Sequence, residues 1–439
     1  MSDKPISYDS LKKILQYMEA NQRIELNTRC PSIRTAEKTA PLKINRLDFK
    51  DSGVCINNTI YKIGIYRKYQ AGKAPEAIAK ANKEGGVDHE VDRFGMKDKS
   101  DEVTVTPGDV VLEKTSVPNS AMSVPGATPE RELGFIKRKI EFCEMVLAMK
   151  REGKGNLLSR LKALNLIPPE GTESDLEEAR AILFAWECRR DNVTPPYDHF
   201  IVMSISSQNN EQKRFEGYMY NKTYREAVKC LTTRIFGGRK FPIHVKNLSF
   251  SGCSIIRLPP GIKFWIDNFE ISTAFVGSSL DAFMPVLHES SFPLKQIKLN
   301  SLRPEDASHP IVMNADSLKF SFHPTARIDL LPNLANRKLV IDANPTLENL
   351  RIILKHLETR PIGTEYIFFS ETHSFSRLLS TIELMLGGRT LYLWEPITIR
   401  NLGNGPIRIC WEECLSFAPG QERAMRMSLR KLSNKLTFN

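Results

Sequence analysis

Apolar side chains recur at helical spacing near the start of the chain. Four of them fall at positions i, i+3, i+4 and i+7, with polar residues between them: Leu11, Ile14, Leu15 and Met18. That spacing places them on one face of a helix over residues 7–18. Two further short apolar patterns follow, through Ile24 and Leu26 and then through residues 33–36, with Pro31 between them. Three small helices are therefore predicted within the first forty residues.

A different pattern dominates the chain beyond residue 240. Pairs of apolar residues separated by one position recur roughly every 21 to 28 residues, as in leucine-rich repeats: Leu248/Phe250, Phe269/Ile271, Ile297/Leu299, Leu318/Phe320, Leu339/Ile341, Ile367/Phe369 and Leu391/Leu393. The most complete copy, Val245-x-x-Leu248-x-Phe250-x-x-Cys253-x-Ile255, fits the consensus LxxLxLxx(N/C)xL at every position. Residues 44–49, Ile44-x-x-Leu47-x-Phe49, begin in the same way, which indicates a related unit in the N-terminal half.

Amphipathic helices are predicted between these strands, over residues 280–288, 347–357 and 375–386. Alternating strands and helices bury their apolar faces by stacking on their neighbours. We therefore expect an open, curved sheet with helices behind it and an exposed strand face. Because the later copies lose the first leucine of the consensus and vary in spacing, an irregular α/β sandwich is the alternative architecture.

The part of the chain before the repeats mixes strands, helices and polar segments. Residues 41–70 alternate apolar and polar side chains, as strands do. Residues 71–128 are polar and rich in glycine, proline and serine, which is typical of a linker or a long loop. Residues 130–190 carry a charged helical pattern interrupted by glycine and proline, which favours a helical hairpin packed on a sheet over a coiled coil. Two strands and a helix are predicted next: 200–206, 215–220 and 223–236.

These patterns divide the chain into five segments. They are an F-box-like helical module, a small β-rich unit, a flexible linker, a helical and strand middle region, and a leucine-rich-repeat-like domain: residues 1–40, 41–110, 111–129, 130–236 and 237–439. A chain of 439 residues exceeds the usual size of one compact core. The predicted fold class is α+β or α/β, with a three-helix unit followed by a degenerate repeat scaffold.

Composition and charge narrow the class of protein. Apolar residues make up 41% and charged residues 26% of the chain, as in ordinary globular proteins, and no run approaches the about 18 apolar residues of a membrane span. The first residues show no pattern of a secretory signal peptide, so the cytoplasm or the nucleus is the expected compartment. The formal net charge is +11, but lysine and arginine are spread along the chain, which disfavours nucleic-acid binding.

The sequence lacks the motifs of common catalytic and metal sites. No phosphate-binding loop, nucleophile elbow, zinc-protease helix or dinucleotide fingerprint is present. The cysteines and histidines show no metal-ligand spacing; the nearest cysteines, Cys410 and Cys414, would approach only if that stretch were helical. Trp265, Trp394 and Trp411 lie in strand-like contexts and fit either a core or a recognition face. We therefore expect no catalytic residue, no metal, no cofactor and no enzyme activity.

The N-terminal segment resembles the F-box, a small helical docking module. Residues 6–18, ISYDSLKKILQYM, are similar to its first helix, and residues 23–26 and 30–34 are similar to its later positions. Ile6-Ser7 stands where the family usually has Leu-Pro. The chain as a whole resembles a large nematode family of F-box-like proteins with an uncharacterised associated domain, through phrases such as SSFPLK (290–295) and SHPIV (308–312).

This resemblance implies a substrate-recognition adaptor of an SCF-type (Skp1–cullin–F-box) ubiquitin ligase, with the repeat face holding an unknown target protein. Six apolar residues would form the docking face for a Skp1-like partner: Leu11, Ile14, Leu15, Met18, Ile24 and Leu26. A charge placed at Leu15 is expected to abolish docking. The alternative is a non-catalytic interaction scaffold with no ligase link, whose N-terminal helices only cap the first sheet. In a variant of this alternative, the basic scaffold also contacts nucleic acid.

Overall fold

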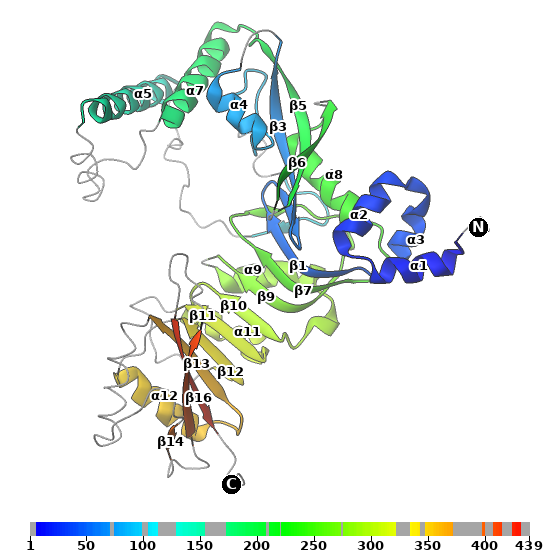
Figure 1. Cartoon of the computed structure of the whole chain (residues 1–439), viewed down its shortest axis with the longest axis vertical. Coiled ribbons are helices and arrows are strands. Elements are labelled where there is room, and N and C mark those ends of the chain that lie inside the picture. The colour runs from blue at the N-terminus through cyan, green and yellow to red at the C-terminus, as the bar shows by residue number, and fades with distance from the viewer. Residues whose placement is uncertain are drawn as a thin grey trace.

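Figure 1 shows a computed structural model of the chain. The described residues are 6–70, 74–98, 104–112, 129–153, 173–207, 210–219, 221–273, 275–321, 334–342, 347–371, 397–399, 407–414 and 424–431. Within them, one sheet of fourteen strands extends through the molecule, and eleven α-helices accompany it. The predicted mixture of α and β structure is confirmed at this level.

The centre of the sheet is a run of seven parallel strands. They lie side by side in the order β1 (Lys43–Lys50), β7 (Ile243–Phe250), β9 (Phe264–Ile271), β10 (Gln296–Leu299), β11 (Ser317–Ser321), β12 (Lys338–Asp342) and β13 (Glu365–Glu371). Antiparallel strands extend the sheet beyond β1: β2 (Gly53–Ile56), β3 (Thr59–Tyr69), β5 (Tyr197–Ser207) and β6 (Asn210–Met219). Others extend it beyond β13: β16 (Ala424–Lys431), β15 (Ile407–Cys414) and β14 (Ile397–Ile399).

The recurring apolar pairs lie at equivalent positions on neighbouring parallel strands. The first members of the pairs form one row, Leu248, Phe269, Ile297, Leu318 and Leu339, and the second members form another, Phe250, Ile271, Leu299, Phe320 and Ile341. All ten side chains are buried. Leu47 and Phe49 of β1 pair with Leu248 and Phe250, so the motif at residues 44–49 occupies the equivalent place on the next strand.

The predicted pair on β13 was wrong by one residue. Tyr366 and Phe368, rather than Ile367 and Phe369, pair with Leu339 and Ile341 of β12. Ile367 is nevertheless buried. Because four consecutive residues of this strand are apolar, alternation alone did not define which of them face the helices. The last predicted pair, Leu391/Leu393, lies outside the described residues, as does the predicted helix 375–386.

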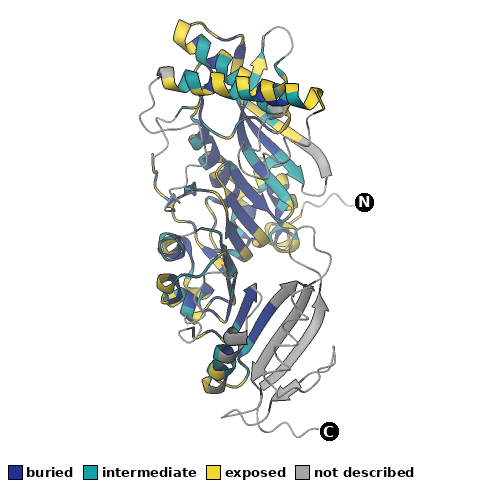
Figure 2. Cartoon of the chain, turned by 90° about the vertical axis from the view of Figure 1, so that its left-hand side faces the viewer, coloured by how far each residue is buried: buried dark blue, intermediate teal, exposed yellow. Residues whose placement is uncertain are grey.

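The helices that follow the parallel strands lie on one side of them, as Figures 1 and 2 both show for α9 (Val276–Phe283), α11 (Pro310–Asn314) and α12 (Leu347–Thr359). The buried rows of the strands pack against this side. Phe250 stacks on Phe283 of α9 with ring centroids 5.1 Å apart, and Phe49 meets Phe236 of α8 (Tyr224–Phe236) at 6.2 Å. Since successive strand residues point to opposite faces, the residues between the rows lie on the other side of the sheet.

Two of these helices test the sequence predictions closely. The predicted helix 223–236 is confirmed, and Thr223 and Glu226 form a capping box at its start. The helix predicted over 280–288 begins earlier, at Val276, and its α-helical part ends at Phe283. Pro285 explains the end, because proline has no N–H to continue the helical hydrogen bonds, and a short 3-10 turn, η2 (Met284–Val286), takes over.

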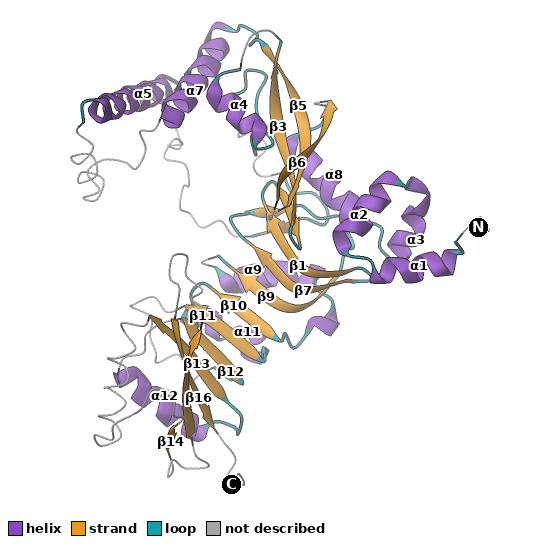
Figure 3. Ribbon diagram, in the orientation of Figure 1, coloured by secondary structure: helices purple, strands orange, loops and turns teal. Residues whose placement is uncertain are grey.

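A helical layer lies at the far end of the sheet, near β3 and β5 (Figure 3). It contains α5 (Pro129–Arg151) and α7 (Glu173–Asp191), which pack on each other, and α4 (Glu76–Lys83), which lies between α7 and β3. The polar stretch 71–128 was predicted to be a linker or loop, but α4 forms within it because Ile78 is buried. Residues 113–128, nearly all of the predicted linker 111–129, lie outside the described residues.

A buried carboxylate fixes the described part of that polar stretch to the body of the protein. Asp109 precedes β4 (Val110–Val111), which pairs with β8 (Ile255–Ile256). Its fully buried side chain receives Lys229 Nζ at 2.9 Å and Arg257 Nη1 at 2.7 Å. Hydrogen bonds from Thr106 and these two cations outweigh the effect of burial and lower the pKa of Asp109.

Candidate partner-binding surfaces

Residues 8–39 form α1 (Tyr8–Tyr17), α2 (Ala20–Arg29), a 3-10 turn η1 (Pro31–Ile33) and α3 (Arg34–Thr39). Local capping explains the breaks between them. The Ser7 hydroxyl accepts the N–H of Ser10 at the start of α1, and the Glu19 carboxylate accepts two backbone N–H groups at the start of α2. Pro31 occupies the first position of η1, which suits a residue without an N–H.

The six residues proposed for docking do not share one exposed face. Leu15 is fully buried and packs with Ala36 and Ala40 in a small core of its own, which Leu11, Met18 and Leu26 partly cover. Ile24 faces another way and belongs to the main core of the protein. Of the six, only Ile14 is exposed, at 47%. The structure therefore brings Leu11, Leu15, Met18 and Leu26 together inside the helical unit and leaves Ile14 outside it.

An exposed apolar patch lies on the outer side of α1. Tyr17 is 91% exposed, and it lies three residues, or nearly one helical turn, from Ile14. We call these two residues the α1 patch. The apolar spacing in the sequence did not include Tyr17. Apart from Ile14, the α1 residues with that spacing pack inside the unit.

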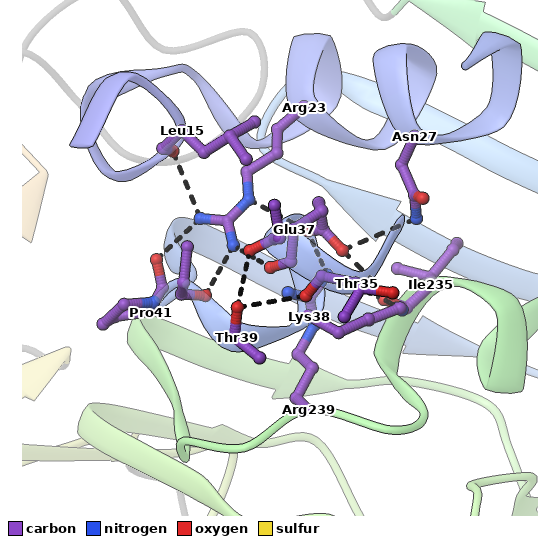
Figure 4. Close-up of polar contacts among 12 residues, drawn as sticks. Leu15, Arg23, Asn27, Thr35, Glu37, Lys38, Thr39, Pro41, Ile235 and Arg239 are labelled. Atoms are coloured by element: carbon purple, nitrogen blue, oxygen red, sulfur yellow. Dashed lines mark hydrogen bonds and ion pairs between the residues drawn. The ribbon is translucent and has the colours of Figure 1, made fainter. Parts of the chain in front are cut away.

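A buried ion cluster joins the helical unit to the rest of the chain (Figure 4). Arg23 of α2 donates from Nε to Glu37 Oε1 at 2.9 Å, and Arg239, in the loop between α8 and β7, donates to the same oxygen at 2.8 Å. The side chains of Arg23 and Glu37 are 1% and 0% exposed, and that of Arg239 is 4% exposed. Arg23 also donates to backbone carbonyls, including those of Leu15 and Pro41. One carboxylate thus fixes α2, α3 and the loop after α8 in one geometry.

Lys38 adds a second connection beside this cluster. Its Nζ donates to the carbonyls of Arg234 and Ile235 at 2.9 and 3.0 Å. These carbonyls lie in the last turn of α8, where orphan C=O groups and the helix dipole attract a cation. Burial, together with the positive charge of Arg239, lowers the pKa of Lys38 to about 8. The helices α1–α3 are therefore attached to α8 and the loop after it through two residues of α3, Glu37 and Lys38.

The side of the parallel strands away from the helices forms a second candidate surface, which we call the strand face. Two rows of residues cross it at matching positions: Arg46, Asn247, Asn268, Gln296, Ser317, Lys338 and Glu365 in one, and Asp48, Ser249, Glu270, Lys298, Lys319, Val340 and Ile367 in the other. Neighbours within the rows bond to each other. Asn268 donates to Asn247 at 2.9 Å, and Lys338 pairs with Glu365 at 3.2 Å.

The three tryptophans predicted to lie in a core or on a recognition face are not all described by the structure. Trp265 of β9 is 43% exposed on the strand face, with the ring of His244 beside it at a centroid distance of 4.6 Å. Trp394 lies outside the described residues, and only the backbone of Trp411, on β15, is described. Cys410 and Cys414 also lie on β15, in extended rather than helical backbone.

Among the described residues we identify no cavity that indicates a particular ligand and no metal site. A cavity of about 770 Å³ lies between α4, α7 and β3, and acidic and basic side chains line it in nearly equal number, among them Arg67, Asp92, Glu178 and Arg189. This balance indicates no particular ligand. Over the described ranges, no three histidine, cysteine, aspartate or glutamate side chains gather as a metal site would need. Nor does any described helix combine the length and apolarity needed to cross a bilayer.

Comparison with known proteins gives one match. Residues 223–372 match the family model described as a domain of unknown function (DUF3557). The matched segment begins at the cap of α8 and ends just after β13, so it contains the parallel strands β7 to β13 and the helices beside them. No curated protein matches the chain. No solved structure matches it either.

Proposed function

We propose that the chain is a non-catalytic substrate adaptor, in which α1–α3 dock on a Skp1-like protein of an SCF-type ubiquitin ligase and the strand face holds a target protein. The α1 patch is the observation that carries the docking half of the proposal. Ile14 and Tyr17 are exposed on a helix whose opposite face is already buried, and large exposed apolar groups at a rigid site are typical of protein interfaces.

The residues proposed for docking then have two roles. Ile14, with Tyr17, would contact the Skp1-like partner directly, and the partly buried Leu11, Met18 and Leu26 would lie at the margin of the contact. Leu15 and Ile24 would support the surface from inside, since both are buried within the chain. A Leu15→Asp variant is therefore a poor test of docking, because it places a charge in the small core and disrupts the helices themselves.

We infer that the target-binding half is a degenerate leucine-rich-repeat array with its strand face open. Support comes from the aligned apolar rows of five successive strands and from α9, α11 and α12, which lie together on one side of these strands. The match to an uncharacterised family over 223–372 indicates that this segment recurs in other proteins. The irregular α/β sandwich is the competing description, and an experimental structure with helices or strands on both faces of β7–β13 would favour it.

The test of docking is co-purification of the full chain with a Skp1-type protein at moderate salt. Ile14→Asp/Tyr17→Asp is expected to lose the partner, because both changes place charge on the α1 patch without entering a core. Gln16→Asp/Gln22→Asp is the matched control, since both glutamines are exposed on the same helical unit and the change in charge is the same. Undiminished co-purification of the patch variant would refute the docking surface.

One observation favours a second function, an interaction scaffold with no ligase link. Ala20 and Ile24 of α2 belong to the main core, so the N-terminal helices also act as a cap on the sheet. If neither the wild-type chain nor the control variant retains a Skp1-type protein, the scaffold function replaces the adaptor, and the strand face keeps its proposed role.

A further inference from the structure

A row of outward-facing residues begins the strand face at its β1 end. Lys43 of β1, His244 of β7 and Trp265 of β9 lie at matching positions of adjacent parallel strands. Their neighbours Ile44, Val245 and Ile266 are buried on the helix side, so the row points the other way. The three strands thus present a cation, an imidazole and an indole side by side.

The aromatic part of this row is held in place. The ring planes of His244 and Trp265 are inclined by 39° to each other, and His244 Nε2 lies 3.6 Å from Asp267 Oδ1. Asp267 also pairs with Lys295 at 3.2 Å, and its side chain is only 15% exposed. Asp267, the carboxylate next to His244, is therefore largely engaged, while Trp265 stays exposed.

The lysines and the arginine around this row, unlike Asp267, lack a partner of opposite charge among the described residues. Lys43, Arg46 and Lys246 are all exposed, and among the residues that the structure describes none of the three forms an ion pair. Further along the face, lysines form ion pairs with glutamates on neighbouring strands, as Lys298 does with Glu270 and Lys338 with Glu365. Positive charge therefore collects at one end of the strand face. We call Lys43, Arg46, His244, Lys246 and Trp265 the cationic aromatic patch.

We propose that the cationic aromatic patch binds an acidic segment of a partner protein. Lysine and arginine at the rim attract carboxylates and speed their approach, and a half-exposed tryptophan supplies the apolar contact that anchors interfaces. The amide side chains of Asn247 and Asn268 continue the surface with groups that both donate and accept hydrogen bonds. This inference deepens the proposed function by naming the class of target, and it rests on the strand face being the target site.

A protein segment fits the surface better than a nucleic acid does. A nucleic-acid strand carries a charge at every nucleotide and needs a continuous cationic track. Here Lys298 and Lys338, farther along the same face, are already paired with Glu270 and Glu365, which interrupts such a track. A peptide can place its carboxylates at the cationic end alone.

The test measures binding of a short fluorescein-labelled peptide of alternating glutamate and serine to the full chain at about 0.15 M salt. The Skp1-like protein is left out, so failure here is separate from failure of docking. Lys43→Glu/Lys246→Glu is expected to weaken binding at least about fivefold, from the loss of two partly screened ion pairs. Trp265→Ala is also expected to weaken it.

The control is Lys137→Glu/Arg138→Glu, which makes the same change in net charge at exposed positions on α5, and it is expected to bind like the wild type. Equal weakening in both charge-reversal variants would mean general attraction to a basic protein and would overturn the patch. Absence of peptide binding would overturn it as well. Tighter binding of a short single-stranded RNA that depends on Lys43 and Lys246 would assign the surface to nucleic acid instead.

Discussion

Glu37 is the residue on which the attachment of the N-terminal helices depends. Its side chain is fully buried and receives two arginines, Arg23 and Arg239, on one oxygen. Burial lowers the pKa of both guanidinium groups, and the carboxylate of Glu37 opposes that shift. Since arginine stays protonated in proteins, removing Glu37 would leave two buried positive charges without their acid.

We therefore expect Glu37→Ala to lower the free energy of unfolding by about 3–5 kcal/mol, as measured by urea denaturation. Glu25→Ala is the control. Glu25 also meets two arginines, Arg29 at 2.5 Å and Arg214 at 3.3 Å, but its side chain is 48% exposed, so its loss is expected to cost no more than about 1 kcal/mol. Similar costs for the two variants would contradict the structural role of the buried cluster.

His199 makes the stability of the protein depend on pH. Burial and the positive charge of Arg67 lower the pKa of His199 from its usual 6.5 to about 4. Between these values the unfolded chain binds a proton that the folded chain does not, so stability falls as the pH drops from 6.5 towards 4. The contribution is at most about 1.4 kcal/mol per pH unit, for a difference of one proton. We expect His199→Gln to flatten the dependence of the urea midpoint on pH over this window, and an unchanged slope would exclude His199 as its source.

Residue-level reasoning from the sequence found the helix around residues 7–18 but not its environment. The apolar periodicity of Leu11, Leu15 and Met18 shows that one face is buried, and a helical pattern is the same whether that face meets the chain or a partner. The polar residues that matter most, Arg23 and Glu37, are fourteen positions apart, and Glu37 also pairs with Arg239, about two hundred residues later. Such a long-range ion cluster leaves no local pattern in a single sequence.

The elements of the repeat region followed their sequence patterns well where strict alternation or a cap was present. The start of α8 is an example, because Thr223 and Glu226 cap each other reciprocally. The register of β13 was missed where four apolar residues run together, and the end of α9 was missed where Pro285 stops the hydrogen bonding. The β13 strand lacks the alternation that defines its two faces. At α9, the prediction overlooked the rule that proline interrupts helical hydrogen bonding.

The cap of α8 gives a prediction at the scale of an element. Thr223→Ala removes the side-chain acceptor for the N–H of Glu226, and we expect it to lower the free energy of unfolding by about 1 kcal/mol. Thr233→Ala in the same helix is the matched control, because Thr233 is exposed and not at the cap, and alanine is the better helix former there. Thermal unfolding of both variants checks the difference; equal shifts would argue against the capping box.

At the scale of the whole molecule, the sheet connects segments that the sequence patterns had separated. The β-rich unit predicted at 41–110 and the repeat domain predicted at 237–439 meet where β1 pairs in parallel with β7 over residues 43–49. The shared opening of their motifs, at Ile44 and Val245, was the only sequence signal of this contact. Pairing between strands two hundred residues apart depends on the path of the whole chain, which periodicity does not report.

Deletion of residues 1–40 is expected to destabilise the remaining chain as well as remove docking. It would expose the part of the main core that Ala20 and Ile24 cover, and it would remove Glu37, the acidic partner of Arg239. We expect a lower urea midpoint for the shortened chain, read from tryptophan fluorescence. A midpoint equal to that of the full chain would show instead that the helices are an independent appendage. Loss of partner binding in this deletion would not by itself locate the docking surface.

The buried cluster of Arg23, Glu37 and Arg239 also affects how a bound target would be oriented. Because these side chains fix α2 and α3 against α8, the α1 patch and the strand face keep a constant separation and orientation. Under the proposed function, a target held at the cationic aromatic patch would always be presented to the ligase from one direction. The choice of lysine for ubiquitin transfer would then be determined by the target's own geometry, with each acceptor lysine reached or missed according to its distance from the acidic segment.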